Sequence, residues 1–209
     1  MYVLSFAGGA VRTSRDGTDP VPALLGALEG VTLALPAERT VGPDLLALAS
    51  RADAALDAVL RAREEGDWRI GLGVGAVRSP LPGSVREIEG PAVVAAQEAV
   101  QAARRERSAT SVPIHVRAAD GRHRETAQDA EAVLGLIGWI VRSRNRGQWQ
   151  AVRALREDPG ATQARLAESL GVTQQTVSRA VKTSGWREES AAHPLASRLL
   201  SMIDLTSER

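Results

Sequence analysis

The sequence predicts an N-terminal α/β or α+β domain followed by an all-helical C-terminal domain. Over residues 1–126, short apolar or β-branched runs bounded by Gly or Pro alternate with longer runs whose apolar residues recur every three or four positions. From residue 127 onward only the helical pattern continues. A chain of 209 residues is also long enough for two small domains with separate cores. We therefore predict domains at 1–126 and 147–209, joined by a connector helix at 127–146.

Four runs in the first domain have the pattern of buried strands, namely 2–6 (YVLSF), 30–35 (GVTLAL), 68–77 (WRIGLGVGAV) and 112–118 (VPIHVRA). Two runs between them, 43–66 and 91–107, have helical periodicity, and the second opens with Pro91, which a first helical turn tolerates. Strands separated by helices predict one sheet covered by helices.

Three alternating glycines in the third predicted strand, Gly71, Gly73 and Gly75, fall on one face of that strand. A face without side chains allows another backbone, a helix or a flat ligand to approach closely. We favour packing of a helix on the sheet over a ligand cleft. The spacing does not match the dinucleotide-binding fingerprint, because no helix opens within the glycine run.

The C-terminal part contains a series of predicted helices at 127–144, 147–158, 162–170, 173–185 and around 194–205. In the run 163–182, the small residue Ala167 allows two helices to approach, and Gly171 follows four residues later, where the chain turns. Thr173 is placed to cap the second helix through its hydroxyl. The inward residues are predicted to be Leu166, Leu170, Val172, Val177 and Val181, which join a third helix through Trp149, Val152 and Leu155. The stretch 162–186 resembles the helix-turn-helix of bacterial transcription regulators, which also occurs in sigma factors and resolvases.

The second helix of this pair presents polar and basic residues on its outward side. Glutamine can form two hydrogen bonds with adenine and arginine can do so with guanine, and the N-terminal part of a recognition helix enters the major groove. We predict base contacts from Gln174, Gln175, Ser178 and Arg179, and phosphate contacts from Thr162, Thr176 and Lys182. With the capping residue, the candidate DNA-binding residues are Thr162, Thr173, Gln174, Gln175, Thr176, Ser178, Arg179 and Lys182. One such unit covers a half-site only, so we also predict a homodimer.

The distribution of charge supports this assignment. Residues 139–187 contain nine Lys and Arg against three Asp and Glu, which gives 9 − 3 = +6, whereas the whole chain has a formal charge of +1. The remainder is therefore +1 − 6 = −5. Such an asymmetry is expected where one module faces phosphates.

The front part of the chain resembles a second family. The strand WRIGLGVGAV, followed by a loop and by EGPAVVAAQEAV, is similar to the class III nucleotide cyclase fold, which has a ferredoxin-like sheet. Together with the first strand, MYVLSFAGGAVRTSR, and the C-terminal helix-turn-helix, nearly the whole chain resembles the SatD family of bacterial proteins.

The resemblance to a cyclase can be tested on carboxylates, because such an enzyme holds two divalent cations with acidic residues. The first location reads Ala7, Gly8 and Gly9, and the second, LPAER, keeps only Glu38. Asp16 and Asp19 in a nearby loop could substitute. The resemblance therefore implies a degenerate cyclase-like domain that serves self-association or ligand sensing rather than phosphoryl chemistry.

These observations predict a DNA-binding transcriptional regulator, not an enzyme, without catalytic residues, metal or cofactor. The expected partners are double-stranded DNA, a second copy of the chain and a small nucleotide as candidate ligand, with no membrane. The chain contains no cysteine, shows no signal-peptide pattern and has no 18-residue apolar run, so a cytoplasmic location is expected. Two alternatives stay open: a nucleotide cyclase or nucleotide-binding enzyme with an accessory helix-turn-helix, and a protein-interaction adaptor whose helix-turn-helix does not touch DNA.

Overall fold

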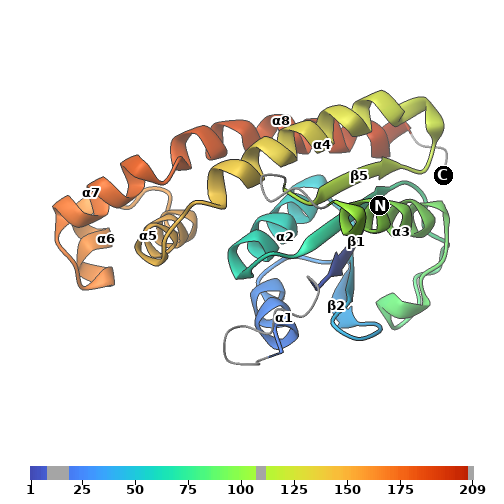
Figure 1. Cartoon of the computed structure of the whole chain (residues 1–209), viewed down its shortest axis with the longest axis horizontal. Helices are drawn as coiled ribbons and strands as arrows, with labels where there is room; N and C mark the ends of the chain where they lie inside the picture. The colour runs from blue at the N-terminus through green and yellow to red at the C-terminus, as the bar shows by residue number, and fades with distance from the viewer. Residues whose placement is uncertain (9–18, 107–111, 207–209) are drawn as a thin grey trace.

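The computed structural model describes residues 1–8, 19–106 and 112–206, and comprises a sheet domain, a two-helix arm and a small helical head (Figure 1). The sheet domain contains, in chain order, β1 (Tyr2–Ala7), α1 (Val21–Glu29), β2 (Leu35–Arg39), β3 (Leu45–Ala49), α2 (Ala52–Glu65), β4 (Arg69–Val74), the 3-10 turn η1 (Val85–Glu87), α3 (Pro91–Arg105) and β5 (Ile114–Ala118). The mixed α/β class predicted for this part is confirmed.

The five strands form one sheet in the order β2-β3-β1-β4-β5. Neighbouring strands are antiparallel except for β4 and β5, which are parallel. The elements from β1 to β4 thus follow the βαββαβ order of a ferredoxin-like sheet, and α3 with β5 extends it by one crossover.

The two faces of the sheet are covered by different helices. On β1, Tyr2, Leu4 and Phe6 alternate with Val3, and the two sets belong to different hydrophobic clusters. The larger cluster lies under α1, α2 and the arm, whereas the smaller one lies under η1 and α3. The sheet is therefore the middle of three layers.

The glycines of β4 serve helix packing. A Cβ placed on Gly73 would overlap the backbone of Ala92 and Ala96, and one on Gly71 would overlap the backbone of Ala96 and Val100. Helix α3 therefore lies with its own backbone directly against the strand, which confirms packing of a helix on the glycine face over a ligand cleft there.

Two predicted elements in this domain were wrong. Residues 45–49, assigned to a helix, form β3, which lies between β1 and β2 and is buried on both faces. A strand buried on both faces has no polar alternation, so its Leu and Ala residues read like a helix. The strand predicted at 30–35 begins only at Leu35, which pairs with Leu48 near the end of β3. Just before it, the Ala34 amide still donates to the Leu48 carbonyl oxygen, but residues 30–33 lie beyond the end of β3. Helix α1 was not predicted.

The arm and head complete the molecule. The turn η2 (Gly121–His123) leads into α4 (Arg124–Val141), the head consists of α5 (Arg146–Glu157), α6 (Gln163–Leu170) and α7 (Gln174–Thr183), and α8 (Trp186–Thr206) follows. Helices α4 and α8 form the arm and pack along each other.

Helix α8 begins eight residues before the predicted tail helix and continues through Pro194. Its C-terminal half returns to the sheet domain, where Ala196, Leu200 and Ile203 enter the large hydrophobic cluster. The N-terminal ammonium group of the chain forms an ion pair with Asp204, and the Tyr2 hydroxyl lies 3.5 Å from the carbonyl oxygen of Leu200. None of the described helices is long and apolar enough to cross a bilayer.

Candidate nucleic-acid interface

The turn between α6 and α7 has the geometry of a helix-turn-helix. Gly171 lies in the left-handed region, with φ 65° and ψ 30°, and its amide donates to the carbonyl oxygens of Ala167 and Glu168. A left-handed residue ends the first helix and lets the second leave in another direction. The predicted roles of Ala167 and Gly171 are confirmed.

The head has a small core of its own. Leu166, Ala167 and Val177 are buried, and the half-buried residues around them are Ala154, Leu155, Ala161, Leu170 and Val181. Val152 and Ala151 of α5 are also buried. Val172, which was predicted to point inward, is 43% exposed at the turn. Val177 is the only fully buried residue of α7, so the rest of that helix is available for contacts outside the head.

The structure exposes most of the candidate DNA-binding residues, which lie at the start of α6 and along α7. Seven of them are exposed and Ser178 is half-buried; the seven are Thr162, Thr173, Gln174, Gln175, Thr176, Arg179 and Lys182. Residues 174–183 contain no Asp or Glu. An approaching phosphate backbone would therefore meet no opposing carboxylate on α7 itself.

Two of the threonines also shape the helices. The Thr173 hydroxyl accepts a hydrogen bond from the Thr176 amide at 3.2 Å, and the Thr162 hydroxyl accepts one from the Arg165 amide at 3.3 Å. Each hydroxyl thereby caps its helix, as predicted for Thr173. Because both helices start toward solvent, their N-terminal amides add partial positive charge where an anion would bind.

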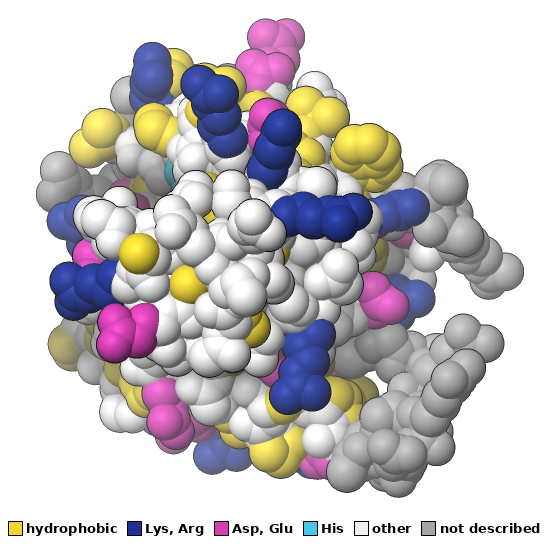
Figure 2. Space-filling view, turned by 90° about the vertical axis from the view of Figure 1, so that its left-hand side faces the viewer, with side chains coloured by type: hydrophobic (Ala, Val, Ile, Leu, Met, Phe, Trp, Pro, Cys, Tyr) yellow, Lys and Arg dark blue, Asp and Glu magenta, His cyan; other side chains and the backbone are white. Residues whose placement is uncertain are grey.

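Figure 2 looks onto the end of the molecule that carries the head. Uncharged side chains and backbone occupy the centre of this view, and Lys and Arg side chains surround them, with acidic side chains interspersed among them. This is the arrangement expected of a surface that reads base edges at its centre and holds phosphates at its rim.

Part of the positive charge counted from the sequence is used inside the protein. Glu189 at the start of α8 is fully buried and lies 2.5 Å from Arg144, 2.7 Å from Arg156 and 3.2 Å from His193. Arg153 and Arg156 also form ion pairs with Glu64 of α2. Arg165 forms an ion pair with Asp158 as well. At least four of the nine basic residues in 139–187 are thus paired within the protein, and the charge available to DNA is smaller than the sum suggested.

The cluster around Glu189 fixes the base of the head. Burial alone would raise the pKa of Glu189, but His193, Arg156 and Arg144 together lower this pKa to about 2, so the carboxylate is ionised near neutral pH. Burial lowers the pKa of Arg144 against the opposing effect of Glu189. The guanidinium groups of Arg144 and Arg156 lie 4.8 and 5.8 Å from the Trp149 ring centre. These contacts join α4, α5 and α8 at one point.

A second contact that holds the head in place was not predicted from the sequence. Asn145 and Gln148 form a capping box at the start of α5, and the Gln148 side-chain amide also donates to the Thr183 carbonyl oxygen at 3.1 Å. The spacing Asn-x-x-Gln is a recognisable helix-start signal and could have indicated the cap. Its bond to the end of α7, 35 residues away, could not be foreseen from local spacing.

Glu38 and Asp19, which were compared with the metal-binding carboxylates of a cyclase, contact other side chains. Glu38 accepts a hydrogen bond from Ser84 at 2.8 Å and lies 3.0 Å from Arg86, and Asp19 forms an ion pair with Arg39. Gly9 and Asp16 lie outside the described residues. Among the residues described, no three His, Asp or Glu side chains are grouped so that they could hold a metal ion.

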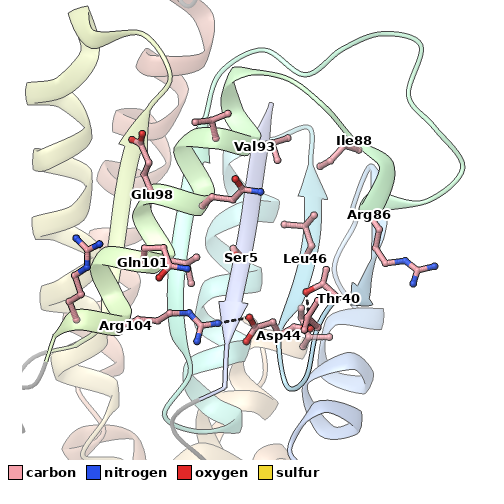
Figure 3. A pocket seen from close by; sticks show the side chains of 16 residues that line it. Ser5, Thr40, Asp44, Leu46, Arg86, Ile88, Val93, Glu98, Gln101 and Arg104 are labelled. Carbon is pink, nitrogen blue, oxygen red and sulfur yellow. Dashed lines mark hydrogen bonds and ion pairs between the residues drawn. The ribbon is translucent and has the colours of Figure 1, made fainter.

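A groove of about 730 Å³ lies on the α3 side of the sheet, over β1 and β3 (Figure 3). Ser5 and Leu46 belong to its strand side, α3 contributes Val93 and Gln101, and an ion pair between Arg104 and Asp44 spans one end. This groove is distinct from the closed contact between α3 and the glycines of β4.

Comparison with known proteins supports the assignment of the head. The model of the MarR family matches residues 143–183, which include α5, α6 and α7. No curated protein and no solved structure matches the chain. The match supports a helix-turn-helix of the kind found in DNA-binding transcription regulators, and it does not extend to the sheet domain.

Proposed function

We propose that the protein is a transcriptional regulator that reads the major groove of DNA with α7. The observation that carries this proposal is the free face of α7, where Gln174, Gln175 and Arg179 are exposed on a helix that buries only Val177. The family match over 143–183 supports the same function. A buried or acidic α7 would have favoured the adaptor alternative.

Each candidate residue has a role that follows from its position. Gln174, Gln175, Ser178 and Arg179 lie within the first six residues of α7 and contact base edges; Ser178, which is half-buried, has the shortest reach. Thr162, Thr173, Thr176 and Lys182 contact the phosphates on either side. The capping threonines can donate their hydroxyl protons to phosphate oxygens while still accepting from the helix amides.

In this proposal the sheet domain is a non-catalytic unit for self-association or ligand sensing, and the regulator is a homodimer. The groove over β1 and β3 is the candidate ligand site, with a small nucleotide as the first ligand to test. Turnover of ATP or GTP in the presence of a divalent metal, abolished by Glu38→Ala, would contradict the non-catalytic assignment.

The DNA-binding proposal is tested with the double variant Gln175→Ala, Arg179→Ala. DNA bound by the wild-type chain is first selected from a genomic pool, and affinities are then measured by fluorescence anisotropy. Each lost bidentate contact removes about 1–3 kcal/mol, so the two together should lower the affinity by at least about 30-fold, with an unchanged melting temperature. Wild-type binding should also weaken steeply as salt is added.

The matched control is Arg78→Ala, which removes an exposed arginine from the sheet domain. It should leave the affinity within about twofold of wild type, since surface substitutions away from the contact have small effects. If the wild-type chain binds no DNA even at low salt, the adaptor alternative is supported and the proposal fails.

A further inference from the structure

Five of the large hydrophobic side chains that are exposed in the described residues lie on the arm. They are Leu136 (65% exposed) and Trp139 (60%) of α4, and Leu195 (44%), Met202 (50%) and Leu205 (81%) of α8. We call these five residues the arm face. The sheet domain and head together expose four others, which are scattered over four separate segments: Val41, Leu81, Val94 and Val172.

The arm face is a continuous surface because of the way the two helices are placed. On α4 the buried residues recur at Ala130, Leu134, Ile137 and Val141, so Leu136 and Trp139 point away from the core. On α8, Leu195 and Met202 each precede a buried residue, Ala196 and Ile203, and therefore point about 100° away from the buried side of the helix. The two helices pack along each other as the outer layer over the sheet domain (Figure 1). Their outward sides therefore form one surface.

The size of this surface suits a second folded partner. A helix of 21 residues, such as α8, is about 30 Å long, and two packed helices are about 20 Å wide, which gives a footprint of about 600 Å². Side-chain relief raises the accessible area above the flat footprint, toward the roughly 800 Å² that each partner buries in a stable interface. Trp139 adds an exposed Trp to this surface, and Trp is among the residue types that contribute most to binding at interfaces.

The charges at the two ends of the arm are complementary to each other. Near the start of α4, the exposed residues Glu125 and Asp129 are acidic and lie, by the helical period, on the same side as Leu136. Near the start of α8, at the opposite end, the exposed residue Arg187 is basic and lies, by the helical period, on the same side as Leu205. A two-fold axis through the middle of the arm face would place the acidic end of one copy against the basic end of another, with the apolar residues between them.

We propose that the arm face binds a second copy of the same chain in an antiparallel four-helix interface. This inference deepens the proposed function, because the arm connects directly to the head and its pairing fixes the distance between two copies of α7. Since each head lies beyond one end of an arm about 30 Å long, the two half-sites are more than one duplex turn apart.

The test measures the mass of the full-length chain in solution by light scattering, without DNA. We expect a dimer at micromolar concentration, and at least a 100-fold weaker dimer for Trp139→Glu and for Leu195→Glu, one substitution on each helix. The matched control Val94→Glu places the same charge on an exposed valine of α3 and should leave the dimer intact. Melting temperatures of all variants are measured, so that a dissociated variant is shown to be folded.

A charge exchange makes the test specific for the antiparallel arrangement. Asp129→Arg alone should weaken the dimer, and adding Arg187→Asp should restore it. A wild-type monomer, or a dimer unaffected by both glutamate variants, would overturn the inference. The DNA-contact variant Gln175→Ala, Arg179→Ala should remain a dimer, so failure of DNA binding and failure of this interface give different results.

Discussion

Helices α3 and α7 differ in how much of their surface they bury. Helix α3 presses its backbone onto the glycines of β4, and its six buried residues are five alanines and Val100. Helix α7 buries Val177 alone and leaves its polar residues in solvent. Helix α3 is therefore held by its packing on the sheet, whereas α7 is held by few contacts and exposes most of its surface to solvent. Four predictions test how these helices, and the head that carries α7, are held.

The largest expected effect concerns the buried charges that hold the head, whose own core has only three buried hydrophobic residues in α6 and α7. Glu189→Ala leaves Arg144 buried without its carboxylate partner and should lower the free energy of unfolding by about 4 kcal/mol. Chemical denaturation monitored by circular dichroism measures this. The neighbouring exposed residue provides the control, because Glu188→Ala should change stability by less than about 0.5 kcal/mol.

The difference in stability between wild type and Glu189→Ala should depend on pH. The pKa of Glu189 is lowered to about 2 in the folded state, so its contribution is present above the ordinary glutamate pKa of 4.5 and is lost as pH falls toward 2. The stability difference between wild type and Glu189→Ala should therefore shrink over that interval. A difference that stays constant down to pH 2 would show that the contribution of Glu189 is not ionic.

The second largest expected effect concerns the packing of α3 on β4. Gly73→Ala places a methyl group where Ala92 and Ala96 backbone atoms lie, and should destabilise the sheet domain by about 3 kcal/mol. The matched control has the opposite sign: Gly26→Ala, in α1 with no atom within 4 Å of the new Cβ, should stabilise by up to about 1 kcal/mol. Thermal unfolding of both variants measures the contrast, and equal shifts would show that α3 can move away from β4.

The smallest expected effect concerns α7, most of whose polar residues are exposed to solvent. Thr173→Ala removes the hydroxyl that accepts from the Thr176 amide, and should cost about 1 kcal/mol in local stability. Hydrogen exchange of the α7 amides should increase while exchange in the sheet domain is unchanged. Increased exchange across both parts would show that α7 is coupled to the sheet domain more strongly than its single buried valine implies.

The helix-turn-helix could be predicted because its signals are local. Gly171 at the turn and Thr173 at the cap act on residues within four positions, so spacing alone locates α6 and α7. The outward side of α7 followed from the same periodicity, with Val172 as the one inward assignment that was wrong. The candidate residues on α7 stay a prediction for DNA contact, although the structure does place them in solvent.

The fold of the sheet domain was harder to predict because its strands pair with residues that are distant in the sequence. Residues 45–49 form a strand because they pair with β1 and β2. Strand β1 is separated from them in the sequence by α1 and β2. The sequence LLALA itself does not favour a strand over a helix. The ion pairs of Arg144 and Arg156 with Glu189 join residues 45 and 33 positions apart. A charge sum along the sequence counts such arginines as surface charge, since it contains no information on burial.

Because α4 leaves the sheet domain and α8 comes back to it, the head is inserted into a helical hairpin rather than attached at the end of a chain. Two covalent crossings hold it, so it cannot rotate about a single tether as a terminal module does. The same topology makes the head exchangeable: another compact helical unit with closely spaced ends could replace it and give the hairpin a different sequence preference.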